Sequence, residues 1–336
     1  MNSSFGQGRR PVDLSILIVN WKSAHYLGPC LRSVYQNTAG LDFEVIVLDN
    51  ASYDGSAELV RTEFPNVIFV QSEENLGFTK GNNVAFRYAV GDTILLLNPD
   101  TEVLPDAIPH LFSQLHAIPD AGAIGCRLLN SDGSTQTTCV QAFPTILNQV
   151  LDIDLLKHAF PTWSLWGMRP LFREPKSPVV VDMICGAFIM VKRAVFEKVG
   201  LLSTDYLMYG DDLDLCYKIK RAGYGVYYTG DAAVIHHGGK SSQRLQDALP
   251  SVWTTAAIYK FLAKARGRGY GSAYRSTLAM GAVLRLGALC CALPFCDPVA
   301  TSAALLKWKR ILQWAVGFTG WAKVAGADAG LPANNQ

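Results

Sequence analysis

Acidic side chains occur at two points of this chain where they could hold a divalent cation and accept a proton. Asp100 comes three positions after the apolar run Ile94–Leu97, and three acids are crowded into residues 211–214. Hard cations such as Mg²⁺ prefer carboxylate oxygen, and a nucleotide diphosphate needs such a cation to screen its charge. Crowded carboxylates raise one another's pKa, which suits a general base. Together the clusters predict transfer of a group from a nucleotide-activated donor.

Both clusters also have ordinary structural explanations. An Asp at the end of a strand is commonly a turn former, which would account for Asp100. Acids at the start of a helix interact favourably with the helix dipole, which would account for Asp211, Asp212 and Asp214. One acid could cap the helix while the next faces a substrate, so the two explanations are compatible.

The segments around Asp100 alternate between strand and helix patterns. They predict strands at residues 14–19, 43–48, 67–70 and 93–97, helices at residues 26–36, 56–62 and 105–117, and a connecting segment at residues 80–89. This β-α-β alternation with short loops implies an α/β fold with a Rossmann-like, mostly parallel central sheet flanked by helices. Ligands bind at the carboxyl ends of such strands, where Asp49 and Asp100 would face one crevice.

The alternation of strand and helix patterns is irregular from residue 130 to 178 and becomes regular again from residue 179. We expect the irregular part to form long loops over the site, where specificity usually resides. The later part predicts strands at residues 179–184, 187–191, 226–228 and 233–235, and helices at residues 193–199 and 213–222. The sequence thus predicts one α/β domain over residues 13–250, after a disordered stretch at residues 1–12.

Further segments carry polar residues that suit a nucleotide. Asp49 could accept a hydrogen bond from a base or a ribose, although residues 49–52 also read as an Asx-turn. The loop Asn75–Asn83 joins glycines and asparagines to a helix start, which attracts phosphate, although these are also ordinary turn residues. An imidazole of His236-His237 could complete a metal site with Asp100 or bind phosphate, although such loop histidines are more often solvated.

The C-terminal part differs from the rest in charge and hydropathy. Residues 251–336 hold ten Lys or Arg and two Asp or Glu, a net charge of +8, whereas residues 1–250 hold 20 basic and 26 acidic residues, a net charge of −6. A basic, apolar extension favours an anionic membrane surface as a partner, and not nucleic acid. A solvated helix with incidental charge is the alternative.

We place this extension at residues 251–325, followed by a disordered tail at residues 326–336. Residues 253–266 have an amphipathic helix pattern, and residues 276–293 are strongly apolar but hold Arg285 and end in a proline-containing segment. A membrane-spanning helix needs about twenty uninterrupted apolar residues. We therefore expect two helices that lie in the membrane interface.

The cysteines and the N-terminus bear on the cellular compartment. None of the eight cysteines belongs to a CxxC pair or to a zinc-binding spacing. Most lie in apolar contexts, where free Cys behaves as a small core residue. The first thirteen residues are polar and lack the apolar core of a signal peptide. We expect the reducing cytoplasm, with the protein peripheral on the inner face of the cell membrane.

Short motifs with a recognisable order run from Leu14 to Ser241. In the first half they are Val19-Asn20-Trp21, the segment Val47–Ser56, Asn75-Leu76-Gly77-Phe78 and Leu97-Asn98-Pro99-Asp100. In the second half they are Gly186–Val191, Met208–Leu215 and His236–Ser241. This set resembles the family 2 glycosyltransferases of the GT-A fold, and most nearly their rhamnosyltransferase-like branch.

The resemblance implies roles for the matching residues. Asp49 corresponds to the nucleobase-binding acid. Asp100 corresponds to the last acid of a metal-binding DxD motif, in which Asn98 replaces the first acid here. His236 corresponds to a histidine that helps to hold the metal, Mg²⁺ or Mn²⁺, and the diphosphate. The donor-binding residues implied in this way are Val19, Asn20, Asp49, Asn75, Gly77, Lys80, Asn83, Asn98, Asp100 and Gly186.

The resemblance also implies an inverting, metal-dependent reaction. Asp212 corresponds to the catalytic base, and Asp211 stands where Glu is usual. Asp212 would remove a proton from an acceptor hydroxyl as it attacks the anomeric carbon, while positive charge stabilises the departing diphosphate. The expected donor is dTDP-rhamnose, with UDP- and GDP-sugars open. The expected acceptor is a lipid-linked saccharide of cell-surface polysaccharide synthesis, reached at the membrane through residues 251–325.

Other functional classes fit the sequence less well. A nucleotidyltransferase needs a Gly-rich, basic loop after the first strand, where this chain has Asn20-Trp21-Lys22-Ser23. A non-catalytic sugar-binding relative would tolerate loss of the acids, yet Asp49, Asp100 and Asp212 are all present. A nicotinamide dehydrogenase is excluded because no GxGxxG follows the first strand.

Overall fold

A mostly parallel sheet is the central feature of the computed structural model, which describes residues 10–173, 177–206, 209–238, 249–292 and 297–318. Its strands are β1 (Leu14–Asn20), β2 (Phe43–Asn50), β3 (Ile68–Ser72), β4 (Thr93–Leu97), β5 (Thr101–Val103), β6 (Ala121–Leu129), β8 (Val179–Val180), β10 (Phe188–Lys192) and β11 (Gly225–His236). Within the described residues these nine strands follow the order β3-β2-β1-β4-β10-β6-β11-β5, and β8 pairs with β11. Only β5, β8 and β10 run against the others. The predicted fold class is confirmed.

The strand ends bring separate motifs to one edge of the sheet. Every residue of β1 is buried, as expected for an apolar run in a sheet covered on both faces. Asn20 at the end of β1 lies opposite Asp49 in β2, and Ile18 lies opposite Leu97 at the end of β4. Phe188, the first residue of β10, faces Leu97 from the other side. The carboxyl ends of β1, β2 and β4 therefore meet the amino end of β10.

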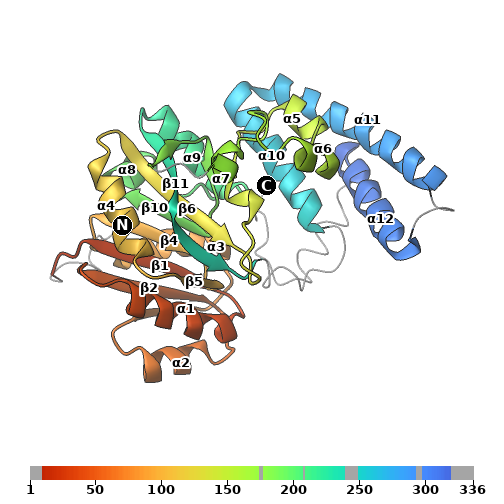
Figure 1. Ribbon diagram of the computed structural model, residues 1–336. Helices are drawn as coiled ribbons and strands as arrows, with labels where there is room; N and C mark the ends of the chain where they lie inside the picture. Colours follow the sequence, from red (N-terminus) through yellow and green to blue (C-terminus); the bar gives the residue numbers. More distant parts are fainter. Residues whose placement is uncertain (1–9, 174–176, 207–208, 239–248, 293–296, 319–336) are drawn as a thin grey trace. The chain divides into compact units, whose positions relative to one another are not determined.

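Helices flank this sheet on both sides (Figure 1), with α1 and α2 on one side and α4 and α8 on the other. By contact, α3 packs on β1 and β2, α4 packs on β6, β10 and β11, and α9 packs on β6 and β11. Their bounds are α1 (Ala24–Asn37), α2 (Ser56–Glu63), α3 (Gly77–Ala85), α4 (Ala107–Ala117), α7 (Arg169–Arg173), α8 (Arg193–Lys198) and α9 (Asp211–Arg221), and short 3-10 turns lie at Phe86–Tyr88 and Thr137–Cys139.

Two segments differ from the sequence prediction. The strands predicted at residues 226–228 and 233–235 form the single strand β11, whose pairing with β6 has a break near its middle. The strand predicted at residues 179–184 is split, because β8 pairs with β11 whereas β9 (Met183–Ile184) pairs with β7 (Val140–Gln141). Local periodicity does not encode which neighbour a strand meets, so sequence alone could not separate these cases.

The chain divides by its contacts into two compact units. The sheet-containing unit comprises residues 1–143, 161–205 and 211–241, and the helical unit comprises residues 144–160, 206–210 and 242–336. Residues 144–160, which the sequence placed in the α/β domain, thus group with the C-terminal helices. Of the stretches predicted to be disordered, residues 10–12 are described; residues 1–9 and 326–336 lie outside the described residues, as do Met208, Gly239 and Ser241 of the motifs.

The helical unit is built from α5 (Ile146–Val150), α6 (Asp154–Ala159), α10 (Leu249–Arg266), α11 (Arg268–Ala292) and α12 (Pro298–Ala315). Val252, Ala282 and Ile311 form its buried core, and Trp308 and Trp314 pack against them. The unit has one long helix more than the two predicted. Among the described helices, none combines the length and the apolar character needed to cross a membrane.

Candidate active site

A buried polar cluster links the ends of β1 and β2. Asn20 Nδ2 donates to Asp49 Oδ1 at 2.7 Å and to Ser56 Oγ at 2.9 Å. Asp49 Oδ2 accepts from the backbone N of Ser52 at 2.9 Å and from Gln71 Nε2 at 2.8 Å. The bond from Ser52 is a turn bond of the kind that the structural alternative for Asp49 requires. The Asp49 carboxylate is therefore held rigidly at the strand end, with both oxygens hydrogen-bonded.

The loop before α3 is fixed to the end of β2 by Asn50. Asn50 Nδ2 donates to the Gly77 carbonyl at 3.1 Å, and its Oδ1 accepts from the backbone N of Leu76 at 3.3 Å. Asn75 Oδ1 accepts from the backbone N of Gly77 at 2.9 Å. Gly77 has a φ of 73°, a conformation that glycine adopts without strain. Sequence reasoning did not select Asn50, although it lies within the motif that contains Asp49.

The other residues predicted to bind the nucleotide-sugar donor near this loop differ in how accessible their side chains are to a ligand. Lys80 is exposed and could reach a ligand. Asn83 already donates to the Leu202 carbonyl at 2.9 Å and accepts from the Leu202 backbone N at 3.1 Å. These two bonds fix the orientation of the Asn83 amide, which keeps a second N–H and a second lone pair for contact with a ligand. Val19 is buried in the core, so its side chain offers only apolar contact.

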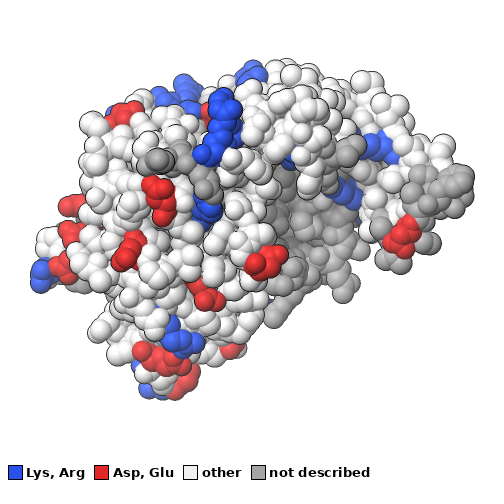
Figure 2. Space-filling model, in the orientation of Figure 1, with Lys and Arg blue, Asp and Glu red and all other residues white. Residues whose placement is uncertain are grey.

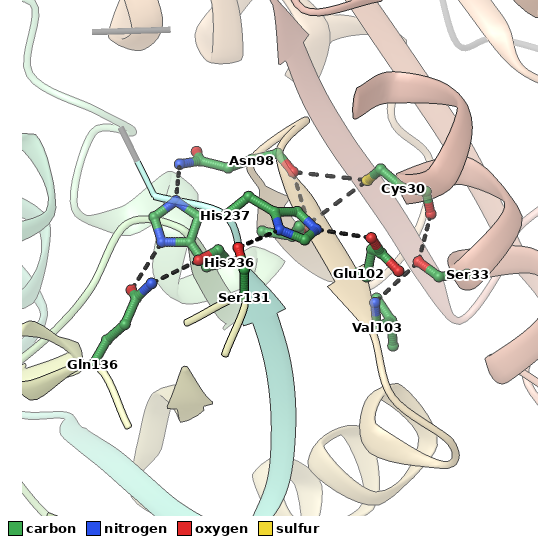
Figure 3. A network of polar contacts seen from close by, with 10 residues as sticks. Cys30, Ser33, Asn98, Glu102, Val103, Ser131, Gln136, His236 and His237 are labelled. Atoms are coloured by element: carbon green, nitrogen blue, oxygen red, sulfur yellow. Dashed lines mark hydrogen bonds and ion pairs between the residues drawn. The ribbon is translucent and has the colours of Figure 1, made fainter. Parts of the chain in front are cut away.

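Pairing of β5 with β11 brings Asp100 and His236 together. In that register His236 lies opposite Thr101. His236 Nε2 lies 3.4 Å from Asp100 Oδ1 and also 3.4 Å from Asn98 Nδ2, and Figure 3 shows Asn98 pointing at this ring. Both side chains are nearly buried, at 12% exposure for His236 and 7% for Asp100.

The spacing of Asp100 and His236 fits a divalent cation. Neighbouring ligands of an octahedral cation with bonds of about 2.1 Å lie about 3 Å apart, close to the 3.4 Å between Asp100 Oδ1 and His236 Nε2. No group of three or more His, Cys, Asp and Glu suited to a metal occurs in the part of the chain that the structure describes. A cation held here would therefore take further ligands from phosphate and water, as Mg²⁺ usually does.

The neighbouring His237 is engaged elsewhere. Its Nε2 lies 2.8 Å from Glu102 Oε1, its Nδ1 lies 2.8 Å from Ser131 Oγ, and its ring stacks on Tyr26 with a centroid distance of 5.5 Å. Figure 3 shows His237 between Ser131 and Glu102. Neither histidine is a solvated loop residue, and only His236 faces Asp100.

Asp212 is held at the start of α9 by main-chain N–H groups. Its Oδ1 accepts from Leu213 N at 2.8 Å, and its Oδ2 accepts from Gly186 N at 3.1 Å. Gly186 lies just before β10, and Ala187 O accepts from Asn98 N at 3.0 Å. Asp212 is thus linked, through the consecutive residues Gly186 and Ala187, to the segment after β4 that contains Asn98 and Asp100.

The two acids that begin α9 have raised pKa values, although each remains partly accessible to solvent. Burial, and next the charge of Asp212, raises the pKa of Asp211 to about 7. Burial also raises the pKa of Asp212, against the two N–H bonds that lower it. The pair therefore titrates jointly. A carboxyl with a pKa near the working pH is suited to general base catalysis.

The third acid of the cluster, Asp214, has a structural role. It is fully buried, its Oδ2 accepts from Ser203 Oγ at 2.5 Å, and Lys218 Nζ lies 3.7 Å from the same oxygen. Asp214 is therefore held by side chains and not by helix capping, and its burial leaves Asp211 and Asp212 as the acids that solvent can reach.

The sequence of the chain is similar to a family model and to named relatives. Residues 15–200 match the family model described as glycosyl transferase family 2. The chain is 27% identical over 241 residues to the low-salt glycan biosynthesis hexosyltransferase Agl10 of Haloferax volcanii. The aligned region is 70% of this chain and 71% of that protein. It is 27% identical over 216 residues to the N-acetylglucosaminyl-diphospho-decaprenol L-rhamnosyltransferase of Mycobacterium tuberculosis. That aligned region is 60% of this chain and 68% of the relative.

A solved structure supports the fold. The mannosyltransferase PcManGT of Pyrobaculum calidifontis, in complex with GDP-Man and Mn²⁺, aligns with a TM-score of 0.52 at 20% identity, over 97% of this chain and 89% of that chain. At this identity the likeness concerns the fold alone.

Proposed function

We propose a specific reaction for this protein from the premise that the chain belongs to glycosyl transferase family 2. The protein is a glycosyltransferase, as its motifs predict. The reaction that its site supports best is inverting, cation-dependent transfer of L-rhamnose from dTDP-rhamnose to a lipid-linked saccharide. The observation that supports this proposal is that Asp100 and His236 lie 3.4 Å apart, while Asp212 at the start of α9 accepts a hydrogen bond from Gly186, whose neighbour Ala187 accepts one from Asn98.

Asp212 is the base in this proposal. Its two hydrogen bonds from backbone N–H groups fix both carboxylate oxygens, and its raised pKa makes it a stronger proton acceptor than an exposed Asp. It takes the proton of an acceptor hydroxyl whose oxygen bonds to the anomeric carbon, while the bond from that carbon to the diphosphate breaks on the opposite face. Inversion follows from this geometry.

The leaving group is stabilised beside Asp100 and His236. A bound divalent cation would neutralise charge that develops on the diphosphate. Asp100 and His236 would hold that cation, Asn98 would donate a hydrogen bond nearby, and the N-terminus of α3 would lie beside the donor. The nucleoside would bind beside the buried Asn20–Asp49 cluster at the ends of β1 and β2, where Asp49 is the residue expected to recognise it.

A lipid-linked acceptor is supported by the helical unit. The name of the M. tuberculosis relative specifies a diphospho-decaprenol acceptor for that protein. Met280, Val283 and Leu284 on α11 are 65%, 56% and 72% exposed and share one helix face. Asp297 is the single acid among the described residues of α10, α11, α12 and their connections, and Figure 2 shows basic side chains over these helices. This combination suits peripheral binding to an anionic bilayer at the cytoplasmic face.

A donor screen tests the proposed reaction. The protein is heated with Mn²⁺ and each of dTDP-rhamnose, UDP-sugars and GDP-sugars, because a bound ligand raises the melting temperature. We expect the largest rise with dTDP-rhamnose, and rhamnose transfer to a polyprenyl-diphosphate-linked N-acetylglucosamine. The exposed-acid variant Asp231→Asn serves as the control and should behave as wild type. If no nucleotide sugar stabilises the protein and none is consumed, the proposal is wrong.

A further inference from the structure

Gln136 makes two contacts with His236 that fix how the imidazole presents its nitrogens. Gln136 Nε2 lies 2.6 Å from the His236 carbonyl oxygen, and Gln136 Oε1 lies 3.0 Å from His236 Nδ1. Figure 3 shows the amide of Gln136 beside the ring, on the side away from Asn98. No sequence pattern had drawn attention to this residue.

The chemistry of these contacts determines the tautomer of His236. A carbonyl oxygen can only accept, so the amide end at 2.6 Å from it must be the NH₂ group. The other end of the Gln136 amide is therefore oxygen, which also can only accept. Hence Nδ1 of His236 carries the proton, and in the neutral ring Nε2 keeps a lone pair.

The lone pair of Nε2 faces Asp100. Two electron-pair donors, Nε2 and the Asp100 carboxylate, thus stand 3.4 Å apart with no proton assigned between them. Both electron pairs are therefore available to a divalent cation, and Asn98 Nδ2, also 3.4 Å from Nε2, can donate to the lone pair of Nε2 when no cation is bound. Histidine ligands of metals characteristically donate their other ring N–H to an oxygen acceptor, which orients the ring and raises its basicity.

The position of Gln136 does not depend on His236. Its backbone N donates to Leu128 O at 2.8 Å, and a bridge between Leu129 and Thr135 closes the preceding turn. The main chain is therefore held by β6, so the amide can be exchanged without dismantling the loop.

We propose that Gln136 is a positioning residue that holds His236 as the Nδ1–H tautomer, with Nε2 free to ligate a divalent cation together with Asp100. The proposal rests on the cation dependence of the proposed function and assigns a residue that neither the motifs nor the comparisons single out. Gln136 itself touches neither the sugar nor the cation.

Mn²⁺ binding in the presence of dTDP, measured by electron paramagnetic resonance, tests the proposal. We expect Gln136→Met, which removes both contacts at nearly equal volume, to weaken Mn²⁺ binding at least about tenfold. Gln136→Glu keeps an oxygen that accepts from Nδ1–H and should bind Mn²⁺ more tightly than Gln136→Met. A merely structural role predicts the reverse order, because Glu places a carboxylate against the His236 carbonyl. Gln141→Met, which removes only an exposed amide contact with Thr138, is the matched control and should bind as wild type.

The nitrogen chemical shifts of His236 in the metal-free protein supply an independent readout. At a pH where the ring is neutral, we expect Nδ1–H in the wild type and a shift towards Nε2–H in Gln136→Met. An Nε2–H ring in the wild type, unchanged Mn²⁺ affinity in Gln136→Met, or no Mn²⁺ binding by the wild type would each overturn the proposal. Tight Mn²⁺ binding without any sugar transfer would instead refute the proposed function and leave the role of Gln136 standing.

Discussion

Replacing Asp211 by Asn should change how the stability of the protein depends on pH. Burial and the charge of Asp212 raise the pKa of Asp211 from 3.8 to about 7. A carboxyl with a raised pKa binds its proton more tightly in the folded state than in the unfolded chain. Its contribution to stability is therefore fully present at low pH and is lost as the pH rises through the folded-state value.

The size of the effect follows from the shift. Each unit of pKa shift corresponds to about 1.4 kcal/mol, so a shift of about three units sets an upper limit of about 4 kcal/mol. Residual solvent access and coupling to Asp212 reduce this, and we take about half. Between about pH 5 and about pH 8 the wild type should lose about 1 to 2 kcal/mol through this group. Asn cannot ionise, so Asp211→Asn should not show this loss.

Urea unfolding at the two pH values measures the difference directly. We expect Asp211→Asn to gain about 1 to 2 kcal/mol of stability over the wild type on going from about pH 5 to about pH 8. Asp231→Asn, which removes an exposed acid, should show no such gain. A stability difference between Asp211→Asn and wild type that is the same at both pH values would refute the argument.

Three further predictions concern a catalytic acid, a backbone position and an exposed apolar side chain. Asp212→Asn should lower kcat about 10²- to 10⁴-fold, as expected for loss of a general base, with little change in donor-induced thermal stabilisation; unchanged turnover would exclude Asp212 as the base. Gly167→Ala should destabilise the protein by more than about 2 kcal/mol in urea unfolding. Gly167 has a φ of +75°, and an added Cβ would meet the backbone N of Ala142. A variant as stable as the wild type would contradict this close approach of the two backbone segments. Leu284→Ser should reduce flotation with vesicles that contain anionic lipid, whereas Val180→Ser, at another exposed apolar site on β8, should not; equal flotation of both variants would argue against α11 as the membrane-binding face.

The part of the site that sequence could predict lies at strand ends. The apolar run Ile94–Leu97 places Asp100 at the edge of the sheet, and the run before His236 places that residue at the end of β11. His236 Nε2 and Asp100 Oδ1 lie 3.4 Å apart, a distance that the hypothesis of a shared metal site requires. Their roles in metal binding, and that of Asp212 in catalysis, stay predictions.

The part that sequence could not predict depends on contacts between distant segments. The amide of Asn83 is hydrogen-bonded to the backbone of Leu202, 119 positions away. A residue that the sequence predicted to bind the nucleotide-sugar donor therefore also has a structural partner. Gln136 meets His236 across 100 positions, through a turn whose geometry no periodicity encodes. Residues 144–160 group with the C-terminal helices, although nothing in their composition indicates it. Local sequence patterns indicate which strand, helix or loop carries a residue. The packing of other elements determines which groups its side chain contacts.

A crystal structure of the protein with dTDP and Mn²⁺ tests the central claim most directly. We predict Mn²⁺ between about 2.0 and 2.3 Å from a carboxylate oxygen of Asp100 and from His236 Nε2, with diphosphate oxygens completing its coordination. The nucleoside should lie beside Asp49, and Asp212 should face the site of the missing sugar. Mn²⁺ and dTDP bound away from Asp100 and His236, or Asp212 turned out of that crevice, would contradict the proposed reaction.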